Sequence, residues 1–251
     1  MLGAGNVSTH ISRHLHSKGH RISCIYSRTG ESANELANEL ETLGTSIRAD
    51  VPGNADFYIV CVPDSVVENV VRNFSGLKGI WLHTAGALSM DLFKGLQTRS
   101  GVLYPLQTLS RKRKVDLSDT PFLVEGSSPE VTASIVDLAN CISENVQEIN
   151  SDTRRIIHLA AVFANNFTNH MVHIGQQILQ ENQMDLELLD PILEETIRKV
   201  KLEGAKDAQT GPALRNDRET MQKHIELLKN HPEWEKIYTF ISRDISRTRA
   251  T

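Results

Sequence analysis

The chain opens on a glycine-rich hexapeptide, Gly3-Ala4-Gly5-Asn6-Val7-Ser8, and this feature restricts the fold more than any other. It matches the dinucleotide-binding pattern G-x-G-x-x-G, with Ser8 in the place of the third glycine. The first glycine of that pattern allows a tight turn, the second lets the backbone approach a pyrophosphate, and the third position needs only a small residue where helix packs on strand. A helix expected over Val7–Ser17 would point its N-terminus at the phosphates. The hexapeptide therefore predicts a dinucleotide site that includes Gly3, Gly5, Asn6 and Val7, although a glycine turn without a ligand is the alternative.

The order of the expected elements changes near residue 150. Before it, short β-branched runs alternate with helical stretches, which is typical of a parallel sheet with crossover helices. After it, long helical periodicity takes over, and a typical length of about 150 residues per domain also favours two domains in 251 residues. We therefore expect an α/β Rossmann-like parallel-sheet domain over residues 1–150 and an all-α domain over residues 151–251.

The expected strands are Arg21–Tyr26, Ser46–Arg48, Phe57–Val62, Gly79–His83, Gly101–Tyr104 and Pro121–Glu125. The expected helices of the first domain are Val7–Ser17, Ser32–Leu43, Val66–Phe74, Leu88–Leu96 and Pro129–Ser143. Those of the second domain are Asp152–Gln180, Leu186–Leu202, Asp217–Asn230 and Pro232–Arg247.

Composition excludes several classes of protein. The 27 Lys and Arg against 31 Asp and Glu leave a net charge of −4, so the basic footprint of a nucleic-acid-binding domain is missing. No apolar run approaches the roughly 18 residues of a membrane span, and the start has neither the basic nor the apolar region of a secretory leader. Cys24, Cys61 and Cys141 are far apart and show no metal-binding spacing. We therefore expect a reduced, cytoplasmic protein without a metal site that binds neither nucleic acid nor membrane.

The end of the second expected strand bears on the choice of cofactor. A site for NAD places an Asp or Glu there, which accepts hydrogen bonds from the ribose hydroxyls. This chain has Ser27, Arg28 and Thr29 instead, and a guanidinium beside two hydroxyls suits a 2′-phosphate. We therefore expect NADP rather than NAD; in the alternative, Arg28 only points into solvent.

Polar residues follow three further expected strands. Ligands of an open α/β sheet lie beyond the carboxyl ends of the strands, so we expect Val62, Pro63 and Asp64 to border the cofactor. Asp64 is alternatively an N-cap of the next helix. His83 is either a ligand-contacting donor or a structural residue, and the basic run over residues 111–114 is either a solvated loop or a surface for an anionic ligand. Further candidates at this edge are Thr84 and Gly86 for the cofactor and Gln107 for the substrate.

Seven short motifs, in order, carry a resemblance to a known family: GAGNVS, SRT, VPDS, HTAGAL, YPLQT, HLAAVFANN and TGPALRND. The chain resembles a bacterial family of oxidoreductases that joins a Rossmann-like NADP-binding domain to a helical C-terminal domain of unknown function. More distantly it is similar to pyrroline-5-carboxylate reductase, ketopantoate reductase and deazaflavin-dependent NADP reductases, and its helical part resembles that of 6-phosphogluconate dehydrogenase. The resemblance implies hydride transfer between a nicotinamide and a small acid.

The chain departs from some of these relatives at one position. Ketopantoate reductase and the hydroxyacid dehydrogenases rely on a lysine, four residues before an asparagine, on the first long helix of the second domain. This chain has no lysine between Lys114 and Lys199. The vacancy favours an alternative function, a non-catalytic NADP-binding sensor or regulatory protein.

The helix expected from Asp152 carries a polar stripe among apolar residues. Spacings of three and four place His158, Asn165, Asn169 and His173 on one side of it. We expect this helix to be largely buried, and buried polar groups need partners. The stripe therefore either lines the substrate cleft or forms a structural hydrogen-bond network.

These patterns suggest roles in a reduction. Imidazole suits proton transfer near neutral pH, so we expect His158 as general acid, with His83 second. Asn166 would orient the substrate carbonyl. Arg215 would grip a substrate carboxylate with its guanidinium fork, unless it only forms an ion pair with Asp217. The other expected substrate-binding residues are Asn165 and Thr210.

We therefore expect an NADP-dependent oxidoreductase that transfers hydride between the nicotinamide and a small carboxylated carbonyl or imine, with a ketopantoate-like acid as one candidate. A structural helical dimer with a vestigial nucleotide domain is a third class. We expect a homodimer through the helical domain, where Trp234 and Phe240 suit either an interface or a core. Only Met1 and Leu2 precede Gly3, although a strand of about five residues should. We therefore expect the native chain to be several residues longer, and a protein that begins at Met1 to be unstable or to bind NADP poorly.

Overall fold

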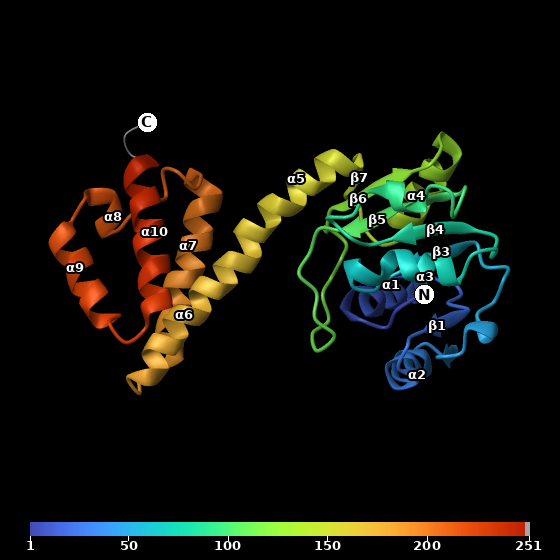
Figure 1. Cartoon of the computed structure of the whole chain (residues 1–251), viewed down its shortest axis with the longest axis horizontal. Helices are drawn as coiled ribbons and strands as arrows, with labels where there is room; N and C mark the ends of the chain where they lie inside the picture. The colour runs from blue at the N-terminus through green and yellow to red at the C-terminus, as the bar shows by residue number, and fades with distance from the viewer. Residues whose placement is uncertain (249–251) are drawn as a thin grey trace. The chain divides into compact units, whose positions relative to one another are not determined.

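The computed structural model describes residues 1–248, and the chain divides into two compact units, Met1–Asn166 and Phe167–Thr251 (Figure 1). The first unit is α/β and the second is helical, so the predicted fold class is confirmed. The predicted domain boundary near residue 150 stays a prediction. Helix α5 (Ser151–Ala161) begins at that point and is counted with the first unit.

The sheet of the first unit has a row of parallel strands with one reversal. Leu2 pairs in parallel with both Tyr26 and Val60, and so joins a two-stranded part of the sheet to a five-stranded part. Its N–H donates to the Ile59 carbonyl (2.8 Å), and its carbonyl accepts from the Cys61 N–H (2.7 Å). The parts are β1 (Cys24–Tyr26) with β2 (Leu43–Thr45), and β3 (Phe57–Val60), β4 (Ile80–His83), β5 (Ser100–Pro105), β6 (Phe122–Gly126) and β7 (Val146–Glu148) in that order.

One strand runs against the expected direction. β6 pairs antiparallel with β5, whereas the other paired neighbours are parallel, so the sheet is predominantly but not wholly parallel. The expected strand at Ser46–Arg48 was also wrong: β2 ends at Thr45, and Thr45 then closes a turn by accepting from the Ile47 N–H (2.9 Å) and donating to Asp50 (2.7 Å).

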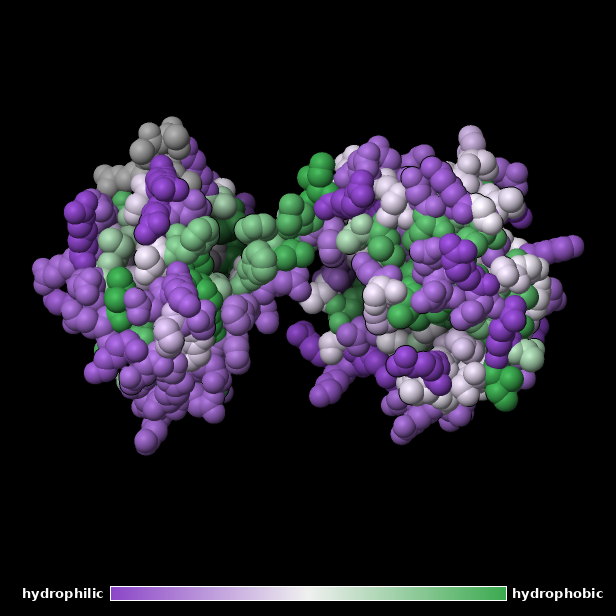
Figure 2. Space-filling view, in the orientation of Figure 1, coloured by the Kyte–Doolittle hydropathy of each residue, from purple (hydrophilic) through white to green (hydrophobic). Residues whose placement is uncertain are grey.

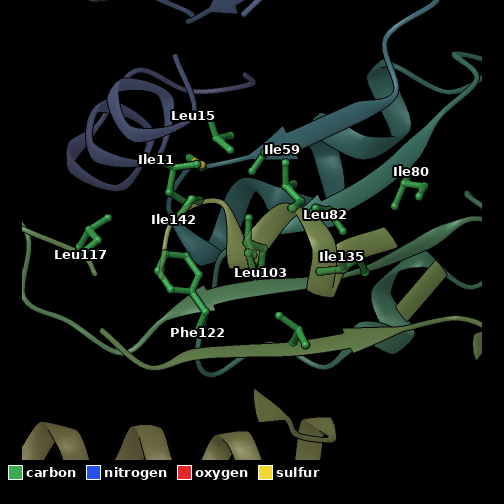
Figure 3. Close-up of a cluster of buried hydrophobic side chains, with 14 of the residues drawn as sticks. Ile11, Leu15, Ile59, Ile80, Leu82, Leu103, Leu117, Phe122, Ile135 and Ile142 are labelled. Atoms are coloured by element: carbon green, nitrogen blue, oxygen red, sulfur yellow. The ribbon is translucent and has the colours of Figure 1, made fainter. Parts of the chain in front are cut away.

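Helices cover both faces of this sheet. On one face, Ile11 of α1 (Asn6–Ser17) and Ile135 of α4 (Pro129–Asn140) pack with strand residues such as Leu82 and Phe122 (Figure 3). On the other face, α3 (Val67–Asn73) packs through Val71 over Trp81, which is fully buried. Helix α2 (Gly30–Glu39) covers β1 through a smaller apolar cluster.

The helix expected over Leu88–Leu96 is only a short 3₁₀ turn, Met90–Phe93. Ser89 caps it by accepting from the Asp91 N–H (3.1 Å), and Gly95 has φ +74°, a conformation that ends helical structure. This segment nevertheless contributes to the core, because Phe93 is only 1% exposed.

The second unit contains only helices among its described residues. The helix expected over Asp152–Gln180 is interrupted by a π-helical segment, Val162–Phe167. The boundary between the two units falls inside this segment, after Asn166. Asp217 caps the helix Arg218–Leu227 by accepting from the Thr220 N–H (3.1 Å) and hydroxyl (2.8 Å). The helices are α6 (Thr168–Glu181), α7 (Asp190–Glu203), α8 (Pro212–Arg215), α9 (Arg218–Leu227) and α10 (Pro232–Thr248), with a 3₁₀ turn at Leu186–Leu189.

The expectation of a largely buried helix after Asp152 was wrong. Its apolar residues Ile156, Leu159 and Phe163 are 70%, 58% and 62% exposed, and Figure 2 shows hydrophobic residues on the surface of α5. The polar stripe is exposed too, except that His158 is half-buried. Among residues 1–248, no helix combines the length and the hydropathy that a bilayer span requires.

Candidate functional site

The glycine turn lies tightly against the sheet. Gly3 has φ +115°, and a Cβ atom there would lie 2.1 Å from the carbonyl oxygen of Cys61. Its N–H donates to the Tyr26 carbonyl (2.7 Å), which ties the turn to the end of β1. Only glycine satisfies both the left-handed conformation and this close approach.

The N-terminus of α1 is open to a ligand. Gly5 is its N-cap, makes no side-chain capping bond and has no other atom within 4 Å of a Cβ built on it. No acidic residue stands in the first turn, so the free N–H groups and the helix dipole favour an anion. Ser8 is fully buried, as the third position of the pattern requires. These features fit a pyrophosphate, as the sequence predicts.

The expected 2′-phosphate site lies at the start of α2. Thr29 is the N-cap of this helix and makes no side-chain capping bond. The hydroxyls of Ser27, Thr29 and Ser32 form a chain, with 3.1 Å from Ser32 to each of the other two. Arg28 is exposed and forms no ion pair within residues 1–248. A free guanidinium, three hydroxyls and a helix N-terminus fit a phosphate monoester.

The basic loop after β5 reaches this region. The Arg111 N–H donates to Asn6 Oδ1 (3.1 Å), and its guanidinium pairs with Glu35 of α2 (2.5 Å). The His10 ring contacts the Ser110 carbonyl through Nε2 (3.0 Å). The basic run therefore lies beside the glycine turn, which its sequence position did not reveal.

Asp64, which follows β3, does not cap the next helix, although this was one alternative for it. Asp64 begins a 3₁₀ turn, Asp64–Val66, and α3 starts at Val67 without a side-chain cap, so the expected capping role of Asp64 is wrong. Thr84 donates to the Val60 carbonyl (3.4 Å), which places its side chain at the same edge of the sheet. Asp64 and Thr84 remain predicted cofactor-contacting residues, with Val62 and Pro63 between β3 and this turn.

His83 is fully buried at the end of β4. Its Nδ1 accepts from the Ala85 N–H (3.2 Å), and its ring stacks on Phe93, with centroids 5.8 Å apart. Burial, with a smaller contribution from the charge of Arg154, lowers the pKa of His83 to about 3. The imidazole is therefore neutral at physiological pH.

Three elements meet at Tyr104 and His158. The Tyr104 hydroxyl lies 3.1 Å from His158 Nδ1, and the two rings meet edge-on at 76°. A Cβ on Gly86 would come within 2.6 Å of that nitrogen and 2.8 Å of Tyr104 Cζ. Gly86 is therefore needed for the contact between a strand residue and a helix residue. Tyr104 was not predicted as a site residue. Its place near the carboxyl end of an expected strand, where ligands of such sheets lie, is the feature that could have indicated it.

A buried cation supports this cluster. Arg154 is 0% exposed and donates from Nη1 to Glu125 Oε2 (2.6 Å) and from Nη2 to the Leu88 carbonyl (2.6 Å). Burial raises the pKa of Tyr104, the charge of Arg154 opposes that rise, and Asp64 adds to it. Arg154 stands one helical turn before His158, so it fixes the start of α5 against the sheet.

The other predicted residues of the first unit are not part of this cluster. Gln107 is exposed and accepts from the Thr108 N–H (2.9 Å). Asn165 and Asn166 are exposed in the π-helical segment. Thr210 and Arg215 are exposed residues of the second unit. Within residues 1–248, no three His, Cys, Asp or Glu side chains come together as metal ligands would.

The fold and the glycine turn define a class: two-part reductases with a Rossmann-like nucleotide-binding unit and a helical unit. A family described as NADP oxidoreductase, coenzyme F420-dependent, matches residues 1–81, and a domain of unknown function, DUF2520, matches residues 120–245. The chain belongs to this family of NADP oxidoreductases, and NADP is its cofactor.

Solved structures agree with this assignment. A candidate NADP oxidoreductase from Bacteroides fragilis is 38% identical, with a TM-score of 0.95, over 98% of this chain and 96% of that one. A reductive aminase from Aspergillus terreus, in complex with NADPH and ethyl-5-oxohexanoate, is 15% identical (TM-score 0.71, 98% and 96% covered). Pyrroline-5-carboxylate reductase from Streptococcus pyogenes is 14% identical (TM-score 0.60, 100% and 97% covered). These last two share the fold, and no curated protein matches the chain.

Proposed function

We propose that this oxidoreductase reduces a small, carboxylated carbonyl or imine compound with NADPH, and that His158 donates the proton. The contact of His158 with Tyr104, beside the loop that follows β4, carries the proposal. Ligands of open α/β sheets lie beyond the carboxyl ends of the strands, where both of these side chains are found. NADPH would supply the hydride, and the chain's own task is to hold the substrate and protonate the nitrogen or oxygen.

We assign roles to the other predicted residues from the surroundings of each side chain. His83 is neutral and enclosed, so we assign it a structural role rather than that of second general acid. Asn166 stays our proposal for orienting the substrate carbonyl, and Asn165, Gln107 and Thr210 stay proposed substrate contacts. Arg215 stays the proposed carboxylate ligand, because its exposed guanidinium has the fork that pairs with carboxylates.

The substrate class rests on two lines of support. The reductive aminase and the pyrroline-5-carboxylate reductase share this fold, and their names indicate imine chemistry for those proteins. The missing lysine sets the chain apart from ketopantoate reductase, so a ketopantoate-like acid is the weaker of our two candidate substrates. We therefore favour a cyclic or open imine that carries a carboxylate.

A two-stage assay tests the proposal. The protein is first titrated against NADPH by cofactor fluorescence, and then screened with carboxylated cyclic imines and 2-oxo acids with and without an amine. We expect turnover with one class and a loss of about 100-fold or more in kcat for His158→Gln. His20→Gln, at an exposed position remote from the cluster, is the control. Binding of NADPH without turnover of any compound would instead favour the sensor function.

We also propose a homodimer formed through the helical unit. Phe240 of α10 is 73% exposed, and Ile192 and Leu202 of α7 are 62% and 73% exposed, so both helices offer apolar side chains that a second copy would bury. Sedimentation velocity should give a dimer mass, and Phe240→Glu should shift it to a monomer. The free thiols Cys24, Cys61 and Cys141 support a reducing, cytoplasmic location, which fractionation of the cell would test.

A further inference from the structure

The Tyr104–His158 contact has a direction that its surroundings decide. A hydroxyl can donate to Nδ1 or accept from it. Burial, the larger effect, raises the pKa of Tyr104 and so keeps a proton on the phenol to donate, while the charge of the buried Arg154 acts in the opposite sense and favours negative charge on the phenol oxygen. A hydroxyl that donates gains negative charge on its oxygen, so this cation favours the arrangement in which Tyr104 donates and Nδ1 accepts. Neutral His158 then carries its proton on Nε2.

We propose that Tyr104 is a positioning residue that supplies, through His158, the proton taken up by the substrate. The Tyr104 hydroxyl holds His158 in the Nε2–H tautomer and passes its own proton to Nδ1 as Nε2 gives one up. This inference rests on the proposed role of His158 as the donor to the substrate.

The relay removes a difficulty in using a neutral imidazole as an acid. Loss of the Nε2 proton alone would leave an imidazolate anion, whereas simultaneous uptake of the Tyr104 proton at Nδ1 leaves His158 neutral. When bound, NADPH would supply a hydride to the carbon of the C=N or C=O bond. His158 Nε2 would then give its proton to the heteroatom, which receives the π electron pair. Tyr104 is left as a phenolate, which Arg154 stabilises until solvent reprotonates it.

Three backbone elements build this contact, which argues that it is not incidental. Tyr104 is the penultimate residue of β5, His158 is on the helix anchored by Arg154, and Gly86 leaves the space in which the rings meet. The groups that act on Tyr104 are Arg154 of α5 and Asp64 after β3, through their charges, and His158 of α5, through direct contact. Of these, the charge of Arg154 favours a donating phenol.

The chain offers a matched control. Tyr238 contacts His224 Nδ1 at 2.9 Å, with the rings at 84°, so a second tyrosine–histidine pair of the same geometry lies in the second unit. Tyr104→Phe and Tyr238→Phe each remove one hydroxyl and keep the ring. Long-range ¹⁵N–¹H NMR of histidine-labelled protein without cofactor reports the tautomer, and His158→Gln assigns the signal.

We expect wild-type His158 to be a single Nε2–H tautomer, and Tyr104→Phe to produce a mixture of tautomers while Tyr238→Phe leaves His158 unchanged. With a substrate from the screen, Tyr104→Phe should lower kcat by about 100-fold with KM and the Kd for NADPH unchanged. It should also abolish the alkaline limb of the pH profile, which lies above the ordinary pKa of tyrosine because burial raises the pKa of Tyr104.

Two results would overturn the relay. One is a wild-type His158 protonated on Nδ1, and the other is a Tyr104→Phe enzyme that keeps its kcat and its alkaline limb. Gly86→Ala is the second variant, because its Cβ would push the two rings apart while both keep their polar groups, and it should reproduce the loss of kcat while far-ultraviolet circular dichroism stays unchanged. If the wild type turns over no substrate, the proposed function fails, and the tautomer measurement still decides the direction of the contact.

Discussion

Arg154 should stabilise the first unit more than any other charged residue of α5. Its guanidinium is 0% exposed and donates to the Glu125 carboxylate, which is 18% exposed, and to the Leu88 carbonyl. Arg154→Met would leave the largely buried Glu125 carboxylate without its cation, with only the Ser151 hydroxyl donating to it, and would leave the Leu88 carbonyl without the guanidinium donor. Breaking a buried pair from one side costs about 3–5 kcal/mol, and the residual exposure of Glu125 places the expected loss near 3 kcal/mol. For a domain of this size that is a fall in Tm of roughly 6–12 °C.

Urea unfolding followed by tryptophan fluorescence measures this loss. A Trp234→Phe background leaves Trp81, buried in the first unit, as the reporter. Arg155→Met is the matched control, since the neighbouring Arg155 pairs with Asp152 at the surface and exposed pairs contribute little. Adding Glu125→Leu to Arg154→Met should restore part of the loss, because it removes the stranded charge. Equal midpoints for the Arg154 and Arg155 variants would refute the reasoning.

Three further outcomes follow from single positions. Arg28→Gln should weaken NADPH at least about 10-fold and leave NADH nearly unchanged, whereas Arg21→Gln should affect neither; fluorescence titration measures both. Gly3→Ala should abolish tight NADPH binding, because its Cβ would overlap the Cys61 carbonyl, and calorimetry should find no saturation. His83 stays neutral in the folded protein down to about pH 3, whereas in the unfolded chain it is protonated near pH 6.5. Its contribution to the free energy of unfolding is therefore fully present above about pH 6.5 and is lost as the pH falls toward 3. His83→Leu should flatten that fall by about one proton, measured as the pH dependence of the unfolding free energy.

The features of the fold that sequence predicted are those with local causes. The glycine turn, the buried strand at Phe57 and the helix that follows Pro129 each carry their signal within a few residues. β7 was not expected, because its three residues show no alternation of apolar and polar side chains. The antiparallel pairing of β6 depends on which neighbour it meets, which no local pattern encodes.

The candidate site was predicted in part for the same reason. His158 stood out because a histidine on an apolar helix is unusual, but its partner Tyr104 lies 54 residues earlier in the sequence. Arg111 was noticed as part of a basic run, while its contact with Asn6 joins residues 105 positions apart. Burial of the helix after Asp152 was predicted least well. A periodic pattern of apolar residues indicates which face of a helix avoids water, but not which element covers that face.

The missing lysine and the buried Arg154 both concern where this chain places positive charge on its first long helix. A lysine on the first long helix would present a cation directly to the substrate, and this chain instead buries its cation, Arg154, at the start of that helix. From there the charge acts on Tyr104, and His158 one turn later contacts the tyrosine. A buried guanidinium cannot give up a proton near neutral pH, so its contribution to the chemistry is to stabilise a charge that forms elsewhere. The phenol oxygen of Tyr104 is where that charge would form, and Arg154→Met should therefore raise the pKa of Tyr104, a shift that ultraviolet titration of the tyrosinate would detect against the Arg155→Met control.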